Sequence, residues 1–333
     1  MSEIKSVLLV GGAGYIGSVL ATTLVKSNFN VKIIDSGFFG FDGISHLLEN
    51  NSIELFKGDI RNKEFLQNSI KNVDCVIHLA AIVGEPLCKK NPIAARQINL
   101  DSLKNILEIC KNNGVQRFIF ASTCSNYGIS DGLVDENSEL KSLSLYSETK
   151  VSGESLVLNF NDEKMNTTVL RFATAFGLSP RMRFDLLLQE FIRDAIVDGK
   201  IIIFGPDSWR PLVHVNDISN ACIQVINAKS EHISSQIFNV GDEENNCTKL
   251  QLAQMIKDFL PKTDIEIHSI KEDPRNYRVS FQKIKNILDF QPQFSIKNGI
   301  SEILNEINLG KIDPRDSEFS NMSKSTENIP IFN

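Results

Sequence analysis

Long hydrophobic runs and concentrated charge are both missing from the 333-residue sequence. No apolar stretch approaches the roughly 18 residues that a membrane-spanning helix needs, so we expect no membrane partner. The net charge is −6 and no basic block is present. We therefore expect no nucleic-acid partner, because clustered Lys and Arg are needed to neutralise a phosphate backbone.

Cysteine pairs and a signal peptide are missing too. The six cysteines are scattered along the sequence: none forms a CxxC pair, and none has a histidine at metal-ligand spacing. This pattern predicts reduced thiols and no metal site. The first residues are polar and lead into a strand-like run, without the basic and apolar regions of a signal peptide, so we expect a cytoplasmic protein. The composition is that of an ordinary globular chain, long enough for a large α/β unit and a smaller one.

Strand-like and helix-like patterns alternate along the first half of the sequence. The helical periodicity is clearest at residues 18–27 and 100–112. Alternation of this kind predicts a Rossmann-type fold, an α/β doubly wound parallel sheet with helices on both faces. The expected strands are residues 7–10, 31–34, 53–56, 75–79, 117–121 and 167–172.

The alternation breaks after Gly177, where a polar loop precedes a predicted helix at 184–197 and a short strand near 201–204. Further helices are predicted at 248–259 and 295–307. We therefore expect a cofactor domain at 1–176 with a returning segment at about 211–240, a smaller α/β substrate domain at 177–210 and 241–312, and a polar tail at 313–333.

A glycine-rich turn follows the first predicted strand and precedes a helix. Its glycines, Gly11, Gly14 and Gly17, are spaced by three residues. This spacing allows a tight turn, a close approach of backbone to a pyrophosphate, and close packing of helix on strand. In this context the motif predicts a dinucleotide site.

Asp35 ends the second predicted strand, about twenty residues after the glycine turn. A carboxylate there accepts hydrogen bonds from the adenine ribose and repels a 2′-phosphate, which favours NAD over NADP. Asp59 and Ile60 after the third strand are expected beside adenine, and Leu79, Ala80 and Ala81 after the fourth are expected against the cofactor. His78 lies within an apolar run, so we expect a structural, hydrogen-bonded histidine there rather than a catalytic one.

Tyr146 and Lys150 are four residues apart and therefore lie on one face of a predicted helix. A nearby lysine cation and the positive nicotinamide ring favour the phenolate, so Tyr146 would take the proton of a sugar hydroxyl as hydride leaves the carbon. Lys150 would also hold the nicotinamide ribose. The pair follows the fifth strand, whose end carries a hydroxyl cluster that includes Thr123 and Ser125.

With these motifs the sequence resembles the extended short-chain dehydrogenase/reductase family, which includes UDP-glucose 4-epimerases, sugar-nucleotide 4,6-dehydratases and nucleotide-sugar 4-dehydrogenases. The resemblance covers nearly the whole chain. It implies that Thr123, four residues before Tyr127, polarises the C4 oxygen of the sugar, and that Asn99 supports the site. It also implies a homodimer through residues 100–112 and 146–159. We further expect Tyr15, Ile16 and Phe172 at the cofactor, and Val83, Cys124, Ser125 and Thr174 at the substrate.

The sequence departs from the dehydratases at one informative place. They carry an Asp-Glu pair directly after the threonine, whereas Cys124 and Ser125 stand here. Neither side chain replaces a carboxylic acid, so 4,6-dehydration is not expected. Cys124 is also one position away from the epimerising cysteine of GDP-fucose synthase-like reductases, so we expect it to pack beside the substrate rather than to act as a reactive thiol.

Arginines are the predicted ligands of the substrate diphosphate, because the planar guanidinium matches phosphate oxygens. Arg210 matches the family arginine that contacts the pyrophosphate, and Arg275 resembles a later family arginine that reaches the diphosphate or the nucleoside ribose. For Arg181 and Arg183, substrate contact and a surface or ion-pair role remain equal alternatives. Short segments around residues 79–86 and 179–185 resemble a branch that includes GDP-heptose 4-dehydrogenases.

Three functions follow from these features. The first is oxidation at C4 of a nucleotide-sugar by tightly bound NAD, either as a 4-epimerase or as a 4-dehydrogenase. The second is the reverse reaction, reduction of a nucleotide-4-keto-sugar. The third is a non-enzymatic NAD sensor on the same fold, against which the presence of Thr123, Tyr146 and Lys150 counts.

Overall fold

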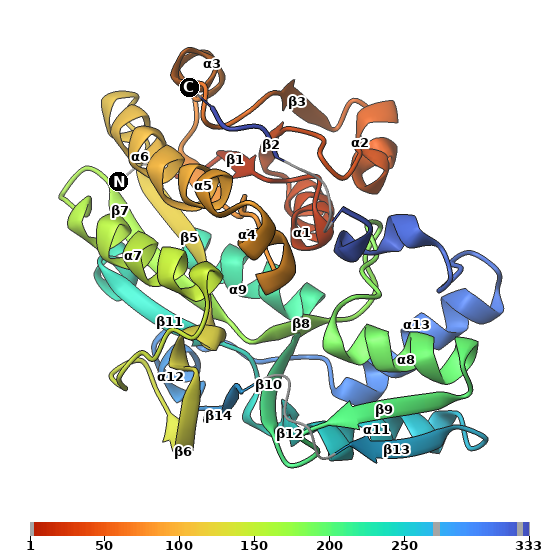
Figure 1. Ribbon diagram of the computed structural model, residues 1–333. Coiled ribbons are helices and arrows are strands. Elements are labelled where there is room, and N and C mark those ends of the chain that lie inside the picture. The colour runs from red at the N-terminus through yellow and green to blue at the C-terminus, as the bar shows by residue number, and fades with distance from the viewer. Residues whose placement is uncertain (1–2, 269–273, 325–328, 333) are drawn as a thin grey trace.

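The computed structural model describes residues 3–268, 274–324 and 329–332. A seven-stranded parallel sheet forms its centre, in the order β11-β7-β5-β4-β1-β2-β3 (Figure 1). The predicted parallel sheet is therefore confirmed, and β11 joins it from a later part of the chain. The strands are β1 (Ser6–Val10), β2 (Asn30–Asp35), β3 (Ile53–Lys57), β4 (Cys75–His78), β5 (Arg117–Thr123), β7 (Asn166–Phe172) and β11 (Gln236–Val240).

Helices cover both faces of this sheet, which explains why the central strands are apolar on both sides. One face packs against α1, α2, α9 and α12, and the other packs against α3, α6 and α7. These helices are α1 (Tyr15–Lys26), α2 (Ser45–Glu49), α3 (Lys63–Ser69), α6 (Ser102–Asn112), α7 (Leu145–Asn159), α9 (Val215–Asn227) and α12 (Gln282–Leu288). The shorter α4 (Glu85–Lys90), α5 (Pro92–Arg96) and α10 (Ser230–Ile233) connect them.

A separate apolar cluster holds the smaller part of the molecule together. It is built mainly from α8 (Leu187–Val197), α11 (Lys249–Phe259) and α13 (Ile296–Asn308). Small sheets in the orders β12-β10-β8 and β13-β9 pack with it, whereas a third small sheet, β14-β6, contributes buried residues to the core of the large sheet. Their strands are β6 (Ile129–Val134), β8 (Thr174–Phe176), β9 (Lys200–Phe204), β10 (Trp209–His214), β12 (Asn246–Thr248), β13 (Asp264–His268) and β14 (Asn276–Val279).

Two predicted helices begin differently from the prediction, for local reasons. α8 begins at Leu187 rather than at residue 184, because the backbone N–H of Phe184 donates to the carbonyl of Phe319 and Leu186 is extended. The helix predicted from residue 100 begins as a π-helical turn, η2 (Gln97–Asp101), and becomes α6 at Ser102. Such π-helical turns are frequent at functional sites, and this one contains Asn99.

The described part of the C-terminal tail contacts both halves of the molecule. Near its start, the backbone N–H of Asn321 donates to Asp185, 3.1 Å away. Its end lies beside α3 (Figure 1), where the backbone of Phe332 exchanges two hydrogen bonds with the Gln97 amide. Arg61 donates to the carbonyl of Pro330 and lies over the Phe332 ring. The tail therefore meets the large sheet next to the carboxyl end of β3.

No helix within the described ranges is long and apolar enough to span a bilayer. The same residues contain no group of three His, Cys, Asp or Glu side chains able to hold a metal ion.

Candidate active site

The three motif glycines differ in what requires them. A Cβ on Gly11 would lie 2.6 Å from the backbone nitrogen of Ala80, and one on Gly17 would lie 2.6 Å from the carbonyl of Gly11. The fold alone therefore requires both. Gly14 is the N-cap of α1, and its Cβ would meet only the Gly11 carbonyl, at 3.7 Å. The space above Gly14, at the positive end of a helix, fits a dinucleotide pyrophosphate.

Asp35 closes the glycine turn from the neighbouring strand. Its carboxylate accepts hydrogen bonds from the backbone N–H groups of Ala13 at 3.0 Å and Gly37 at 2.9 Å. Burial raises its pKa, and these backbone donors oppose the rise. The carboxylate thus lies at the end of β2, in the place where the sequence predicts a ribose ligand.

Asp59 lies one strand further along the same edge and is held by Arg61. The guanidinium donates from Nε at 3.0 Å to Asp59 Oδ1 and from Nη2 to Oδ2. Burial raises the pKa of Asp59, but the bonds from Arg61 outweigh it and leave the pKa below its usual value. Ile60, between them, is buried.

Asn99 fixes the loop after β4. Its Oδ1 accepts from the backbone N–H of Ile82 at 2.7 Å, and its Nδ2 donates to the Ile82 carbonyl and to Thr149 Oγ1 on α7. The N–H groups of Leu79 and Ala80 both donate to the Val10 carbonyl at 2.8 Å. This loop, with Ala81 partly exposed, is therefore tied to both the first strand and α7.

Lys150 is buried beneath the carboxyl end of β5. Its Nζ donates to the Ala121 carbonyl at 2.7 Å, lies 4.7 Å from the centroid of the Phe120 ring and 5.9 Å from that of Tyr146. Burial lowers the pKa of Lys150 to about 8, while the nearby Glu154 carboxylate raises it. The ammonium therefore faces the same region as the phenol.

Tyr146 belongs to a small apolar cluster with Leu87 and Cys88. Burial raises its pKa above the ordinary value, Cys88 adds to the rise, and the charges of Arg183 and Arg275 oppose it. The sequence predicts that Lys150 and NAD lower the pKa of Tyr146. Two of the predicted substrate arginines therefore act electrostatically on the phenol in this structure.

Thr123 and Ser125 form one hydroxyl pair at the end of β5. Their Oγ atoms are 2.9 Å apart, and the backbone N–H of Ser125 donates to Thr123 Oγ1. Cys124 points elsewhere: it is 1% exposed, and its thiol donates to the Arg171 carbonyl at 3.2 Å. The structure therefore places Cys124 in the core behind the site, contrary to the expectation that it packs beside the substrate.

The predicted substrate arginines are held by the protein itself. Arg210 is buried and donates to the carbonyls of Trp209 and Arg275, at 2.7 and 2.6 Å. Arg181 donates to the Met182 carbonyl, and burial lowers its pKa to about 10. Arg183 pairs with Asp185, so the ion-pair alternative holds for it in this structure.

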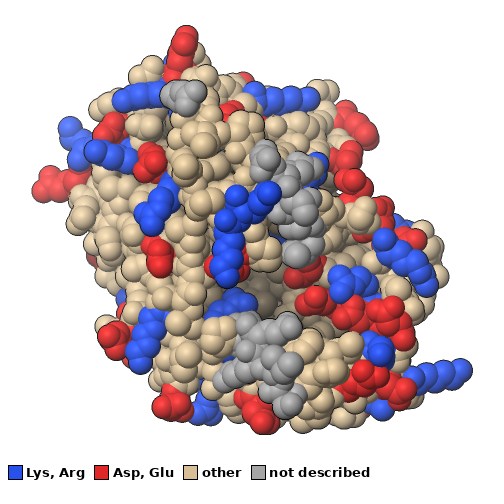
Figure 2. Space-filling model, in the orientation of Figure 1, with Lys and Arg blue, Asp and Glu red and all other residues tan. Residues whose placement is uncertain are grey.

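Arg275 is exposed, unlike Arg210. Figure 2 shows basic side chains at the margin of a hollow near the centre of one face. The other predicted site residues lie at strand or helix ends near this edge of the sheet: Tyr15, Ile16, Val83, Phe172 and Thr174. The Tyr15 phenol donates to the Gly177 carbonyl, 2.7 Å away, so only its backbone faces the glycine turn.

The expectation of a hydrogen-bonded His78 is wrong. Neither ring nitrogen has a partner within the described structure. The ring stacks on Phe120 at 5.9 Å between centroids, and burial lowers its pKa to about 3, with Lys150 acting in the same direction. His78 is thus a neutral, apolar-packed residue.

One charged group near the site carries no separate motif in the sequence. Glu154 on α7 and Arg171 on β7 form a buried ion pair, with 4% and 3% of their side chains exposed. Their positions give a partial signal, because Tyr146, Lys150 and Glu154 follow one another at intervals of four on one helix face.

Comparison with known proteins decides the family. The model of the NAD dependent epimerase/dehydratase family matches residues 7–241. The chain belongs to this family. Its members are NAD-dependent enzymes, so NAD is the cofactor, and the alternative of a non-enzymatic sensor is set aside.

Two relatives of this epimerase/dehydratase family member carry the names of nucleotide-sugar enzymes. The chain is 30% identical over 312 residues to the uncharacterized UDP-glucose epimerase YtcB of Bacillus subtilis, covering 89% of this chain and 95% of the relative. It is 28% identical to the UDP-N-acetyl-alpha-D-glucosaminuronate decarboxylase of Bacillus cytotoxicus, and the match covers 90% of this chain and 97% of that relative.

A solved structure agrees in fold. UDP-glucuronic acid 4-epimerase from Bacillus cereus, in complex with UDP-glucuronic acid and NAD, has a TM-score of 0.82 and 26% identity, covering 91% of this chain and 99% of that one. The Rossmann-type fold is therefore confirmed.

Proposed function

We propose that the protein oxidises C4 of the sugar in a nucleotide-sugar and returns the hydride to the other face, as a 4-epimerase. The observation that carries this proposal is the position of Lys150, which donates to the Ala121 carbonyl on β5, two residues before Thr123, and lies 5.9 Å from the centroid of the Tyr146 ring. Relatives named UDP-glucose epimerase and UDP-glucuronic acid 4-epimerase support it.

Each of these residues has a defined task. Thr123 would donate to the C4 oxygen, and the Tyr146 phenolate would accept the proton of that hydroxyl. Lys150 would hold the nicotinamide ribose and stabilise the phenolate. When bound, NAD supplies the hydride acceptor. Arg183 and Arg275, whose charges oppose the rise in the pKa of Tyr146, would face the diphosphate side of the substrate.

The residues after Thr123 favour simple oxidation over elimination. Cys124 is buried in the core and Ser125 bonds to Thr123, so no carboxylic acid stands beside the threonine to protonate a leaving hydroxyl. This arrangement supports a 4-epimerase or 4-dehydrogenase over a 4,6-dehydratase. The assignment to the GDP-heptose 4-dehydrogenase branch remains a prediction from short segments.

The test is turnover of UDP-glucose and UDP-glucuronic acid by purified protein without added oxidant. Mass spectrometry identifies the nucleotides carried through purification, proton NMR identifies the product, and absorbance at about 340 nm reports NADH. We expect the C4 epimer with no net NADH. A ketone with stoichiometric NADH would make the protein a 4-dehydrogenase, and turnover of only the 4-keto sugar with NADH would make it a reductase. A dehydrated product would overturn 4-epimerisation and the exclusion of elimination, because 4,6-dehydration also begins with oxidation at C4.

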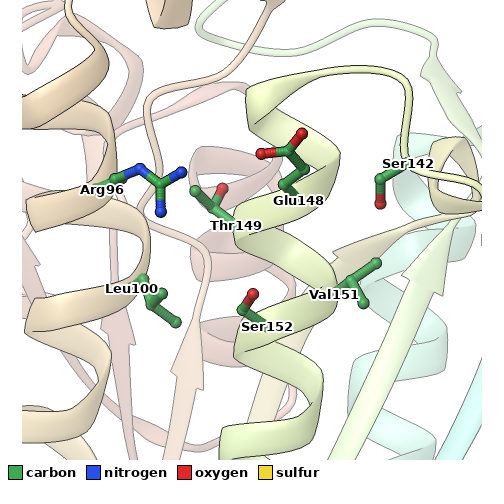
Figure 3. A pocket seen from close by; sticks show the side chains of 7 residues that line it. All are labelled: Arg96, Leu100, Ser142, Glu148, Thr149, Val151 and Ser152. Carbon is green, nitrogen blue, oxygen red and sulfur yellow. The ribbon is translucent and has the colours of Figure 1, made fainter.

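We also propose that the protein is a homodimer. The helical face named by the family resemblance contains a pocket of about 340 Å³ between η2 and α7 (Figure 3). Leu100, Val151, Arg96 and Glu148 are among the residues that line it. The predicted catalytic residues Thr123, Tyr146 and Lys150 do not line this pocket. Light scattering should give twice the chain mass, and Val151→Arg should give the monomer.

A further inference from the structure

A network of buried polar side chains lies directly behind the predicted catalytic residues. Arg171 donates to the Glu154 carboxylate from Nε at 3.0 Å and from Nη2 at 2.7 Å. Ser122 Oγ and Asn126 Nδ2 donate to the other side of the same carboxylate. Arg171 also donates to the Tyr127 hydroxyl at 3.0 Å. The carboxylate thus joins α7, β7 and the turn that follows β5.

The network touches the site at adjacent residues. Lys150 donates to the carbonyl of Ala121, and Glu154, one turn later on α7, accepts from the side chain of Ser122. Thr123, which carries the predicted polarising hydroxyl, follows Ser122 directly in β5. Two consecutive residues of β5 are therefore joined to two consecutive turns of the helix that carries Tyr146.

We propose that Glu154 is a positioning residue, whose bonds to Ser122, Asn126 and Arg171 set the place of Thr123 relative to Tyr146 and Lys150. This role rests on the proposed C4 chemistry, because the reacting atoms must be held within a fraction of an ångström of their working geometry. The ion pair is buried, and the cost of removing two charges from water offsets much of their mutual attraction. Stability alone therefore does not account for the pair, which favours a role in positioning the site.

Glu154 has a second, electrostatic effect on Lys150. Its carboxylate raises the pKa of Lys150 against the lowering effect of burial, which leaves that pKa at about 8. Loss of the carboxylate lowers this pKa further, so the ammonium is lost at a lower pH. The basic limb of the pH–rate profile therefore moves to lower pH when Glu154 is neutralised.

The first test removes the Ser122 hydroxyl, with its bonds to Glu154 and Asn126, but no charge. Ser122→Ala should lower kcat about tenfold and leave KM for the nucleotide-sugar unchanged, because a small misplacement of Thr123 affects only the chemical step. The matched control is Ser69→Ala, another buried serine, whose hydroxyl donates to the Phe65 carbonyl on α3. Equal loss of kcat in the two variants would overturn the positioning role.

The second test neutralises the carboxylate at constant shape. In Glu154→Gln we expect the Lys150 pKa, followed by ¹³C NMR of its ε-carbon with Lys150→Met as the assignment control, to fall below that of the wild type. Glu243→Gln is the control, because Glu243 pairs with Lys285 elsewhere in the fold, at 2.7 Å. An unchanged Lys150 pKa and an unchanged pH–rate profile in Glu154→Gln would leave only a structural role.

The two tests separate the positioning role from the proposed function. The NMR titration needs no substrate, so it gives a result even where the wild type turns over no nucleotide-sugar and the proposed function fails. If Glu154→Gln does not fold, Ser122→Ala still decides, because Glu154 keeps its bonds to Arg171 and Asn126 in that variant.

Discussion

The cofactor side and the substrate side of the cleft are built in opposite ways. On the cofactor side, Gly14 is the N-cap of the helix that follows β1, Asp35 ends the neighbouring β2, and the space above Gly14 is open. On the substrate side, Arg181, Arg183 and Arg210 bond to backbone carbonyls or to a carboxylate of the protein. The first side is ready for its ligand, whereas the second must exchange internal bonds for those of a substrate.

The largest effect expected is on the chemical step that joins the two sides. Tyr146→Phe removes the proton acceptor, so kcat should fall by about 10² to 10⁴-fold while NAD stays bound. Steady-state kinetics and the nucleotide content of the purified variant measure the two quantities. Ser155→Ala, on the same helix and exposed, is the control; equal turnover of Tyr146→Phe and wild type would refute the assigned role.

Asp35→Asn tests whether the carboxylate at the end of β2 selects the cofactor. Hydrogen bonds to a charged group contribute about 1.5–3 kcal/mol, so NAD affinity should fall by about tenfold or more and discrimination against NADP should shrink. Isothermal titration calorimetry with both dinucleotides measures this. Unchanged preference for NAD over NADP would place the selecting group elsewhere.

Substitutions at Gly14 and Gly17 sharpen the contrast between ligand and fold. Gly14→Ala should weaken NAD binding by about tenfold, or about 1.4 kcal/mol, and leave the melting temperature of the NAD-free protein unchanged. Gly17→Ala should instead destabilise that protein by about 1–3 kcal/mol, because its Cβ would overlap the Gly11 carbonyl. Thermal unfolding with and without NAD separates the two, and equal destabilisation would contradict the distinction.

These differences show what the sequence predicts and what it does not. The six strands and the cofactor cradle follow from local patterns, because apolar runs and a glycine turn need only neighbouring residues. The bonds of Arg210 could not be predicted, since its partner Arg275 is 65 residues away. Cys124 was expected at the substrate, and only the packing behind β5 shows that its side chain points into the core.

A pair of arginine variants tests the substrate side. Arg275→Ala should raise KM for the nucleotide-sugar about fivefold, equivalent to about 1 kcal/mol, with little change in stability, because this side chain is exposed. Arg210→Lys should raise KM and also lower the melting temperature, because a lysine cannot bond to the carbonyls of Trp209 and Arg275 in the planar geometry of a guanidinium. Calorimetry alongside kinetics measures both, and the reverse pattern would assign the diphosphate to Arg210.

The smallest effect is expected at the C-terminal tail. Gln97→Ala removes two hydrogen bonds to Phe332 and one from Arg61, and it loosens the hold of the tail on Arg61, which in turn holds Asp59. NAD dissociation should accelerate by about threefold or less, since a hydrogen bond contributes only about 1 kcal/mol. Stopped-flow fluorescence measures the rate, and a rate equal to that of the wild type would separate the tail from the cofactor side.

The burial of all six cysteines has a practical consequence for these experiments. Thiol reagents attack the thiolate, and burial raises the pKa of each of these thiols, for example that of Cys222 to about 12. A maleimide dye should therefore label a single cysteine introduced on the surface of the native protein without prior removal of the natural ones. Fluorescent probes can then be placed on either side of the cleft in an otherwise unaltered enzyme.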